Sequence, residues 1–178
     1  MRLMDGLMAF PGVLLAMVRN DLPVKTPQDL IQLARQRPVT VGNYSIGSGW
    51  QMQVSQLNKE TGGQFTLINY KGTSQVLTDL ASGQIDVGAG SMLGATAFLQ
   101  KKLVRPLLIF SESGSAKLPG IPTWVEAGFT SPAFKSLLEY NMLLAPTGTP
   151  AEIIQRMAEL SLDADAHSAR IRGLKDLT

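Results

Sequence analysis

Three segments rich in Gly, Ser or Thr have the residue types to hold an anionic ligand: Ser45–Trp50, Tyr70–Ser74 and Gly88–Leu93. Each follows an expected strand and precedes an expected helix, and in an open α/β sheet such loops gather at the carboxyl ends of the strands. Backbone N–H groups and hydroxyls can approach a ligand closely there, and helix N-termini add partial positive charge. Together the loops indicate an anion site built without arginine. For each loop taken alone, the alternative to ligand binding is that its residues only cap a helix or form a turn.

The same residues do not form a catalytic motif. Ser48 lies on an expected strand-to-helix turn, but a nucleophile elbow needs glycine where Ile46 and Trp50 stand. The only histidine, His167, falls in an expected C-terminal helix, and the chain has no cysteine, so zinc, iron–sulfur and Cys–His chemistry lack their ligands and nucleophiles. The order Lys71-Gly72-Thr73 does not fit a phosphate-binding loop. We therefore expect no enzyme activity, no metal and no cofactor.

Some side chains near these loops admit more than one interpretation. Lys71 could contact a ligand or pair with Asp79, and we favour a place on the surface or rim. Asp86 could contact a ligand, but we favour a role in satisfying nearby backbone groups. We expect Trp50 to be exposed at a loop edge, where it would line the crevice or cover the start of a helix. Trp124 is expected to pack against the sheet.

Composition limits the class of protein. The 178 residues are 44% hydrophobic and 17% charged, with a net charge of +2 and no block of like charges. This favours one domain or two small lobes with a well-packed core, and it argues against a dedicated nucleic-acid surface. The apolar stretch near the N-terminus is interrupted by Asp5 and Pro11, lacks a small-residue cleavage site, and is too short to span a membrane.

Strand and helix patterns alternate along the chain and position the three loops. Val13–Val18 is expected to be a strand buried on both faces, as parallel sheets require. The other expected strands are Val39–Gly42, Gln64–Tyr70, Ile85–Ala89, Arg105–Phe110 and Asn141–Ala145. The expected helices run from Thr26-Pro27 to Pro38, over Trp50–Thr61, from a Thr73 or Ser74 cap to Gly83, over Leu93–Lys102, over Thr123–Glu126, and from Thr149 toward Arg170. The alternation predicts an α/β fold with a mainly parallel sheet.

A set of short sequence runs, in this order and spacing, resembles the Bug-type, or TctC-like, periplasmic solute receptors of tripartite tricarboxylate transporters. The runs that carry the resemblance are Pro27–Ala34, Ser45–Ser48, Tyr70–Gly72, Leu77–Leu80, Gly83–Asp86, Leu118–Thr123, Glu126–Gly128, Leu143–Pro146 and Gly148–Pro150. Each run alone is a weak signal, but the set is specific.

The resemblance implies the type II periplasmic-binding-protein fold, in which two lobes close around a small carboxylated solute and deliver it to membrane permease subunits. It implies ligand-binding roles for Ser45, Gly47, Ser48 and Gly49 at a helix N-terminus, with Tyr70 and Lys71 bordering the cleft and Gly90 and Ser91 lining it. Trp50 and Gly72, which neighbour these residues, complete the candidate ligand-binding set. The chain departs from the family pattern at Ser45, where a glycine is common, and at Gln51, near a common histidine. Gly90-Ser91 stands where many relatives have an Asp-Asn type pair.

The resemblance also implies a lobe organisation. Residues 1–17 would be a remnant of lobe 1 with a crossover strand, 18–140 a nearly complete lobe 2, and 141–178 a crossover strand and helix returning to lobe 1. A complete receptor has about one more lobe, so we expect weak or absent binding by this chain alone, and exposed apolar surface could make it a homodimer. The implied location is the periplasm, although this chain shows no signal peptide.

Two other functions stay open from the sequence. One is the effector-sensing lobe of a bacterial transcription regulator, which would need a DNA-binding segment that this chain does not contain. The other is a degenerate paralogue that no longer binds a solute. An enzyme of the carboxylate or hydrolase type is disfavoured because no nucleophile, base and metal constellation is present.

Overall fold

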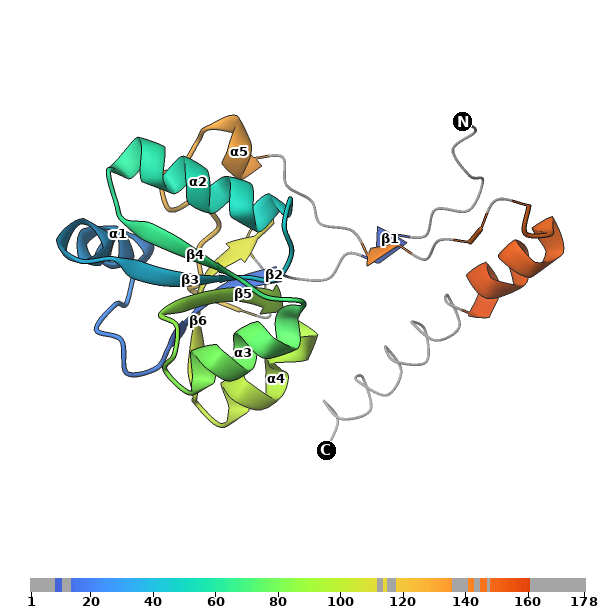
Figure 1. Ribbon diagram of the computed structural model, residues 1–178, viewed down its shortest axis with the longest axis horizontal. Helices are drawn as coiled ribbons and strands as arrows, with labels where there is room; N and C mark the ends of the chain where they lie inside the picture. The colour runs from blue at the N-terminus through green and yellow to red at the C-terminus, as the bar shows by residue number, and fades with distance from the viewer. Residues whose placement is uncertain are drawn as a thin grey trace. The chain divides into compact units, whose positions relative to one another are not determined.

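A five-stranded sheet in the order β4-β3-β5-β2-β6 organises most of the chain (Figure 1). The computed structural model describes residues 9–10, 14–111, 114, 118–135, 141–142, 145–146 and 148–160. The strands of this sheet are β2 (Leu14–Arg19), β3 (Val39–Asn43), β4 (Phe65–Asn69), β5 (Val87–Ser91) and β6 (Val104–Phe110). The α/β fold class predicted from the sequence is confirmed.

The direction of β2 differs from the expectation. This strand pairs antiparallel with both β5 and β6, whereas β3 pairs parallel with β4 and β5, so β2 opposes the other strands of a mixed sheet. Leu15 to Val18 are buried, as the apolar run predicted. Burial on both faces follows from helices on both sides of the sheet, and it says nothing about strand direction. The inference from double-sided burial to a parallel pairing was therefore wrong for β2.

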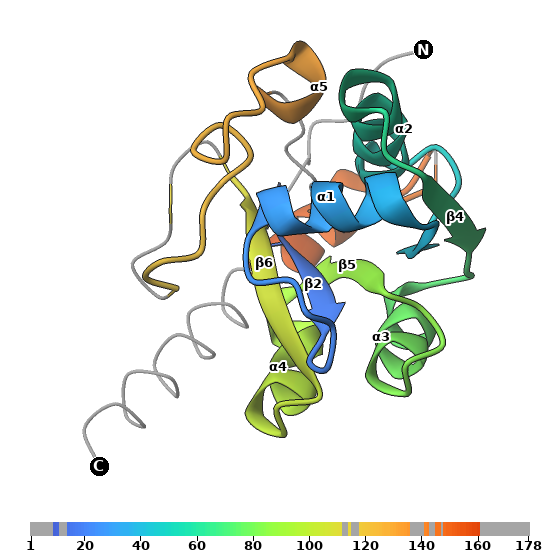
Figure 2. The same cartoon turned by 90° about the vertical axis from the view of Figure 1, so that its left-hand side faces the viewer.

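Helices cover both faces of the sheet (Figure 2). On one face, α1 (Pro27–Gln36), α2 (Gly49–Thr61) and the short α5 (Pro132–Lys135) contribute Leu30, Val54 and Phe134 to one apolar cluster. On the other face, α3 (Thr73–Ala81) and α4 (Met92–Gln100) contribute Leu80 and Ala95 to a second cluster. Alternate residues of β2 belong to opposite clusters, as the pleat of a strand requires.

Local signals set the ends of α1 and α2 as expected. The Thr26 hydroxyl accepts from the Asp29 amide at 3.1 Å, and the Asp29 carboxylate accepts from the Thr26 amide at 2.9 Å, which forms a capping box before Pro27. Hydrogen bonds from the Lys25 and Thr26 amides hold the pKa of Asp29 below its usual value. Gly62 ends α2 in the left-handed conformation, with φ of 66°.

Other elements differ from those expected from the sequence. Thr123 and Glu126 form reciprocal capping bonds of 2.8 and 3.2 Å, but the segment forms turns and not an α-helix. The last expected strand is shorter, because β7 covers only Asn141–Met142 and Ala145 lies outside it. A helix begins at residue 151 and is described to residue 160, so its expected continuation toward Arg170, and with it His167, lies outside the described residues.

The chain divides into two compact units. The larger is Pro11–Glu139, which contains the five-stranded sheet, and the smaller combines Met1–Phe10 with Tyr140–Thr178. In the smaller unit β1 (Ala9–Phe10) pairs antiparallel with β7. β2 belongs to the larger unit, although residues up to 17 were expected to accompany the N-terminal piece. Within the described residues, every helix is too short or too polar to cross a membrane.

Candidate functional site

The loops singled out from the sequence meet at one edge of the larger unit's sheet. β3, β4 and β5 run in the same direction and end at Asn43, Asn69 and Ser91. α2, α3 and α4 begin just after these ends, and Figure 1 shows all three starting on the same side of the sheet. We call this region the carboxyl edge. It has the place in the fold at which open α/β sheets bind their ligands.

An asparagine pair that the sequence analysis did not consider ties the first two loops together. Asn43 is fully buried, and its Nδ2 donates to Oδ1 of Asn69 at 2.8 Å. Its Oδ1 accepts from the Ser48 hydroxyl at 2.9 Å, and its carbonyl accepts from the Tyr70 amide at 2.8 Å. Asn43 thus holds the start of the Ser45–Trp50 loop and the start of the Tyr70–Ser74 loop in place. The available signal was an amide side chain directly after the expected strand Val39–Gly42.

The first loop satisfies several of its own polar groups. Ser48 is the N-cap of α2, and its hydroxyl accepts from the Gln51 amide at 3.2 Å while donating to Asn43. The Gly47 amide donates to Oε1 of Gln51 at 2.8 Å, and Gly47 has the left-handed φ of 80° that favours glycine. Ser45 is exposed and Gly49 is half-buried. Gln51 therefore satisfies a backbone amide of this loop that a ligand could otherwise have used.

Trp50 does not lie at the surface. Its side chain is only 3% exposed, and its Nε1 donates to the carbonyl of Gly42 at 2.9 Å. The ring packs 5.4 Å from that of Phe110, which in turn stacks on Trp124. The expectation of an exposed Trp50 was wrong, because the first turn of α2 faces the apolar sheet. Trp124 is buried in the same cluster, as expected.

The second loop leads into a helix without a side-chain cap. Thr73 and Ser74 were expected to cap α3, but both lie in its first turn, and the N-cap is Gly72. Among the described residues, no side chain caps the N-terminal amides of α3, whereas Thr26, Ser48 and Ser91 cap α1, α2 and α4. Lys71, immediately before this terminus, is exposed. The partial positive charge of α3 therefore lies beside a full positive charge at the carboxyl edge.

Tyr70 anchors that loop to the body of α3. Its hydroxyl donates to Oδ2 of Asp79 at 2.7 Å, two turns into the helix. Burial and this hydrogen bond raise the pKa of Tyr70 to about 12, so the phenol stays protonated. Asp79 therefore pairs with Tyr70, and Lys71 lies on the surface or rim, as favoured from the sequence.

Glycines in the sheet let α3 approach closely. A Cβ on Gly90 would lie 2.6 Å from Cγ2 of Thr73, and a Cβ on Gly88 or Gly42 would lie 2.7 or 2.8 Å from Cγ1 of Val76. Gly90 is buried under the first residue of α3, so its main effect is on the position of that helix. Ser91 is half-buried and caps α4 by accepting from the Gly94 amide at 3.1 Å.

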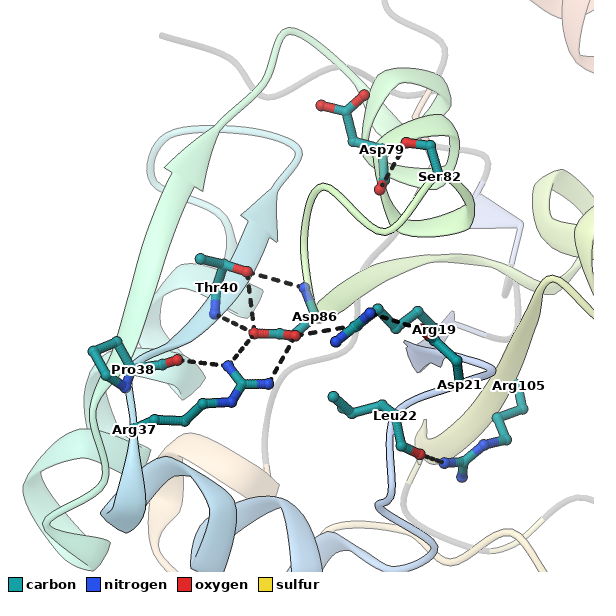
Figure 3. Close-up of polar contacts among 10 residues, drawn as sticks. All are labelled: Arg19, Asp21, Leu22, Arg37, Pro38, Thr40, Asp79, Ser82, Asp86 and Arg105. Atoms are coloured by element: carbon teal, nitrogen blue, oxygen red, sulfur yellow. Dashed lines mark hydrogen bonds and ion pairs between the residues drawn. The ribbon is translucent and has the colours of Figure 1, made fainter.

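Asp86 lies at the opposite edge, where β5 begins, and has a structural role (Figure 3). Its carboxylate accepts from the Arg37 guanidinium at 2.8 and 3.0 Å, from Nε of Arg19 at 3.2 Å, and from the amide of Thr40 at 3.1 Å. Burial by itself raises the pKa of this carboxyl, but the bonds from Arg37 and Thr40 and the two positive charges outweigh burial and lower it. The bond from the Thr40 amide agrees with the favoured role of satisfying backbone groups, whereas the pairing with Arg19 and Arg37 was not predicted.

The described residues of the carboxyl edge offer groups that suit an organic anion. α2, α3 and α4 have no acidic residue in their first turns. Across the described part of the chain, no group of three His, Asp or Glu side chains is placed to hold a metal ion.

Comparisons with known proteins point the same way. The family described as tripartite tricarboxylate transporter family receptor, TctC, matches residues 4–176. A UPF0065 protein encoded in the gbd 5' region of Cupriavidus necator is 32% identical over 146 residues, which are 79% of this chain and 42% of that protein.

Two solved structures from Rhodopseudomonas palustris share the fold. Rpa4515 with adipate is 29% identical with a TM-score of 0.71, and the match covers 85% of this chain and 50% of that one. MatC with bound malate is 23% identical with a TM-score of 0.67, covering 84% and 50%. The chain thus spans about half the length of the relatives that it matches.

Proposed function

The chain belongs to the tripartite tricarboxylate transporter receptor family, and on this premise we propose that it captures a small carboxylated solute at the carboxyl edge. This is a family of solute-binding receptors and not of enzymes, in agreement with the lack of a catalytic motif in the sequence. Delivery of the solute to membrane permease subunits, and a periplasmic location, are parts of the same proposal. The relative that binds adipate supports a carboxylate as the ligand.

The uncapped N-terminus of α3 beside Lys71 is the observation that carries the proposal. A helix N-terminus has the effect of about half a positive charge, and an anion there satisfies N–H groups that otherwise bond only to water. α1, which follows β2 and not a strand ending at this edge, has Asp29 in its first turn. The helices of the carboxyl edge have no acidic residue in their first turns, and α3 also has no side-chain cap, so its positive end is available to a ligand.

Binding by this chain alone is expected to be weak. One edge covers a ligand from one side, whereas well-formed sites bury most of a small ligand's surface. A Kd of about 1 mM, equivalent to about −4 kcal/mol, is therefore compatible with the proposal, and the assay must detect affinities of that order.

The test is a two-dimensional NMR titration of the ¹⁵N-labelled 178-residue chain with adipate, with the uncharged diamide of the same acid as control. We expect adipate to shift the amide signals of Gly72 to Gln75 and of Ser91 to Gly94, and the diamide to leave them unchanged. Lys71→Gln should weaken the adipate response. Lys59→Gln, which removes an exposed lysine from the last turn of α2, should not.

Two results would contradict the proposal. Adipate could leave the amides of the carboxyl edge unshifted at concentrations well above the millimolar range, which would favour a degenerate paralogue. Alternatively, the diamide could produce the same shifts as adipate, which would show that the carboxylates are not recognised.

A further inference from the structure

The most exposed large apolar side chains of the larger unit's described residues gather at the carboxyl edge. Leu93 is 80% exposed, Ile46 is 77% exposed and Met52 is 56% exposed. Ile46 belongs to the loop between β3 and α2, Met52 to the start of α2 and Leu93 to the first turn of α4. The next most exposed, Leu103, is 42% exposed and lies between α4 and β6, at the other end of the sheet.

Neither Ile46 nor Leu93 packs in an apolar cluster of the fold. Ile46 lies in a loop fixed on both sides, because Asn43 ends β3 in the core and Ser48 bonds to it at 2.9 Å. Leu93 is in the first turn of its helix, and side chains on a helix tilt toward the helix N-terminus, so it leans toward the carboxyl edge. The local structure thus holds both side chains in water, which is unfavourable unless something else covers them.

The positive end of α3 lies at the same edge of the sheet as these side chains. Thr73, the first residue of α3, lies directly over Gly90, three residues before Leu93. The loop of Ile46 follows β3, which is hydrogen-bonded to β5. The edge therefore combines a place for a negative group with apolar side chains on neighbouring connections.

We propose that Ile46 and Leu93 form an apolar subsite for the hydrocarbon chain of the ligand, so that the chain selects longer aliphatic dicarboxylates over short or hydroxylated ones. This inference rests on the function proposed above. The occupant is the methylene segment of a dicarboxylate, because the carboxylate then lies at the α3 terminus and Lys71 while the methylenes cover Ile46 and Leu93. The 29% identical relative with adipate, whose carboxylates are separated by methylenes, has a ligand of this kind.

The experiment measures affinity along a series of succinate, adipate and suberate, by NMR titration of the full chain. Burying a methylene is worth up to about fourfold in affinity, so the Kd of the wild-type chain should fall along the series by up to that factor per methylene. Ile46→Ser/Leu93→Ser should flatten the series, because it weakens the binding of suberate and adipate more than that of succinate. Leu103→Ser, at the other end of the sheet, is the matched control and should keep the wild-type gradient.

Methyl signals give a second measurement that does not depend on variants. In the wild-type chain, the Ile46 Cδ1 and Leu93 Cδ methyl signals should shift more with suberate than with succinate. Equal shifts, equal affinities along the series, or a gradient that survives Ile46→Ser/Leu93→Ser would overturn the subsite and leave the proposed function standing. Methyl signals that move with protein concentration and not with ligand would overturn it too, by assigning the patch to a second copy of the chain.

Failure of the proposed function has a different signature. In that case no dicarboxylate of any length shifts the amides of Gly72 to Gln75, and the subsite falls with it.

Discussion

Replacing Gly90 by alanine should displace the start of α3 and destabilise the protein. The added Cβ would lie 2.6 Å from Cγ2 of Thr73, whereas its distances to Cε of Met17 and Cδ2 of Leu77 would be 3.7 and 3.8 Å. Carbon atoms in good contact are about 3.5–4.0 Å apart, so only the Thr73 methyl is too close, by about 1 Å. The clash therefore involves one atom pair, which a second substitution can remove.

The expected energies follow from this geometry. Overpacking a close-packed site costs about 1–3 kcal/mol, and the lower entropy of an unfolded chain with alanine recovers about 0.4–1 kcal/mol of that. Gly90→Ala should thus lower the free energy of unfolding by about 1–2 kcal/mol. Thr73→Ser, which removes the clashing methyl, should cost under about 1 kcal/mol by itself. The double variant should be within about 1 kcal/mol of wild type, a coupling of the size found for residues in contact.

Urea unfolding followed by circular dichroism measures the stability of the wild type, the two single variants and the double variant. With a slope of about 1–3 kcal/mol/M, Gly90→Ala should lower the midpoint by about 0.3–2 M without changing the slope. Thr73→Val in the Gly90→Ala background is the control, because valine lacks the hydroxyl but keeps the branched γ position. The reasoning is refuted if Gly90→Ala is neutral, or if valine restores stability as well as serine does.

Three further predictions concern other bonds of the structure. Asp86→Asn should lower the free energy of unfolding by about 2–4 kcal/mol. Asp21, an exposed residue, pairs with Arg19 as Asp86 does, and Asp21→Asn should cost under about 1 kcal/mol in parallel urea titrations. Because folding lowers the pKa of Asp86, its contribution is present above the ordinary value of 3.8 and is lost as the pH falls below it, so the gap between wild type and Asp86→Asn should close in acid. Tyr70→Phe should cost about 1 kcal/mol and remove the tyrosine absorbance step near pH 12, and since folding raises this pKa, the contribution of Tyr70 should be lost as the pH rises from 10 toward 12. Trp50→Phe should cost about 1–3 kcal/mol by removing the bond from Nε1 to the Gly42 carbonyl and by leaving a cavity in the buried cluster, and the wild-type tryptophan emission should be that of buried indole; a neutral substitution would contradict the buried position.

Much of the fold could be predicted because its signals are local. Thr26, Pro27 and Asp29 start α1 through bonds that span three residues, and Gly62 ends α2 because it adopts a positive φ. The loops at the ends of β3, β4 and β5 were recognisable from glycine and hydroxyl residues between apolar runs. The direction of the strands could not be predicted, because an apolar run is compatible with parallel and with antiparallel neighbours. β2 is antiparallel to both of its neighbours.

The types of the five sheet strands and of helices α1 to α4, the capping of α1, the family, and the region that forms the candidate site could all be derived from the sequence. How that region is built depends on the tertiary structure. The close approach of Thr73 to Gly90, the bond from Asn43 to Asn69 and the pairing of Arg37 with Asp86 join residues far apart in the sequence. Caps and turns depend on neighbours within one helical turn, whereas these contacts depend on which strands lie side by side, and no local pattern contains that information.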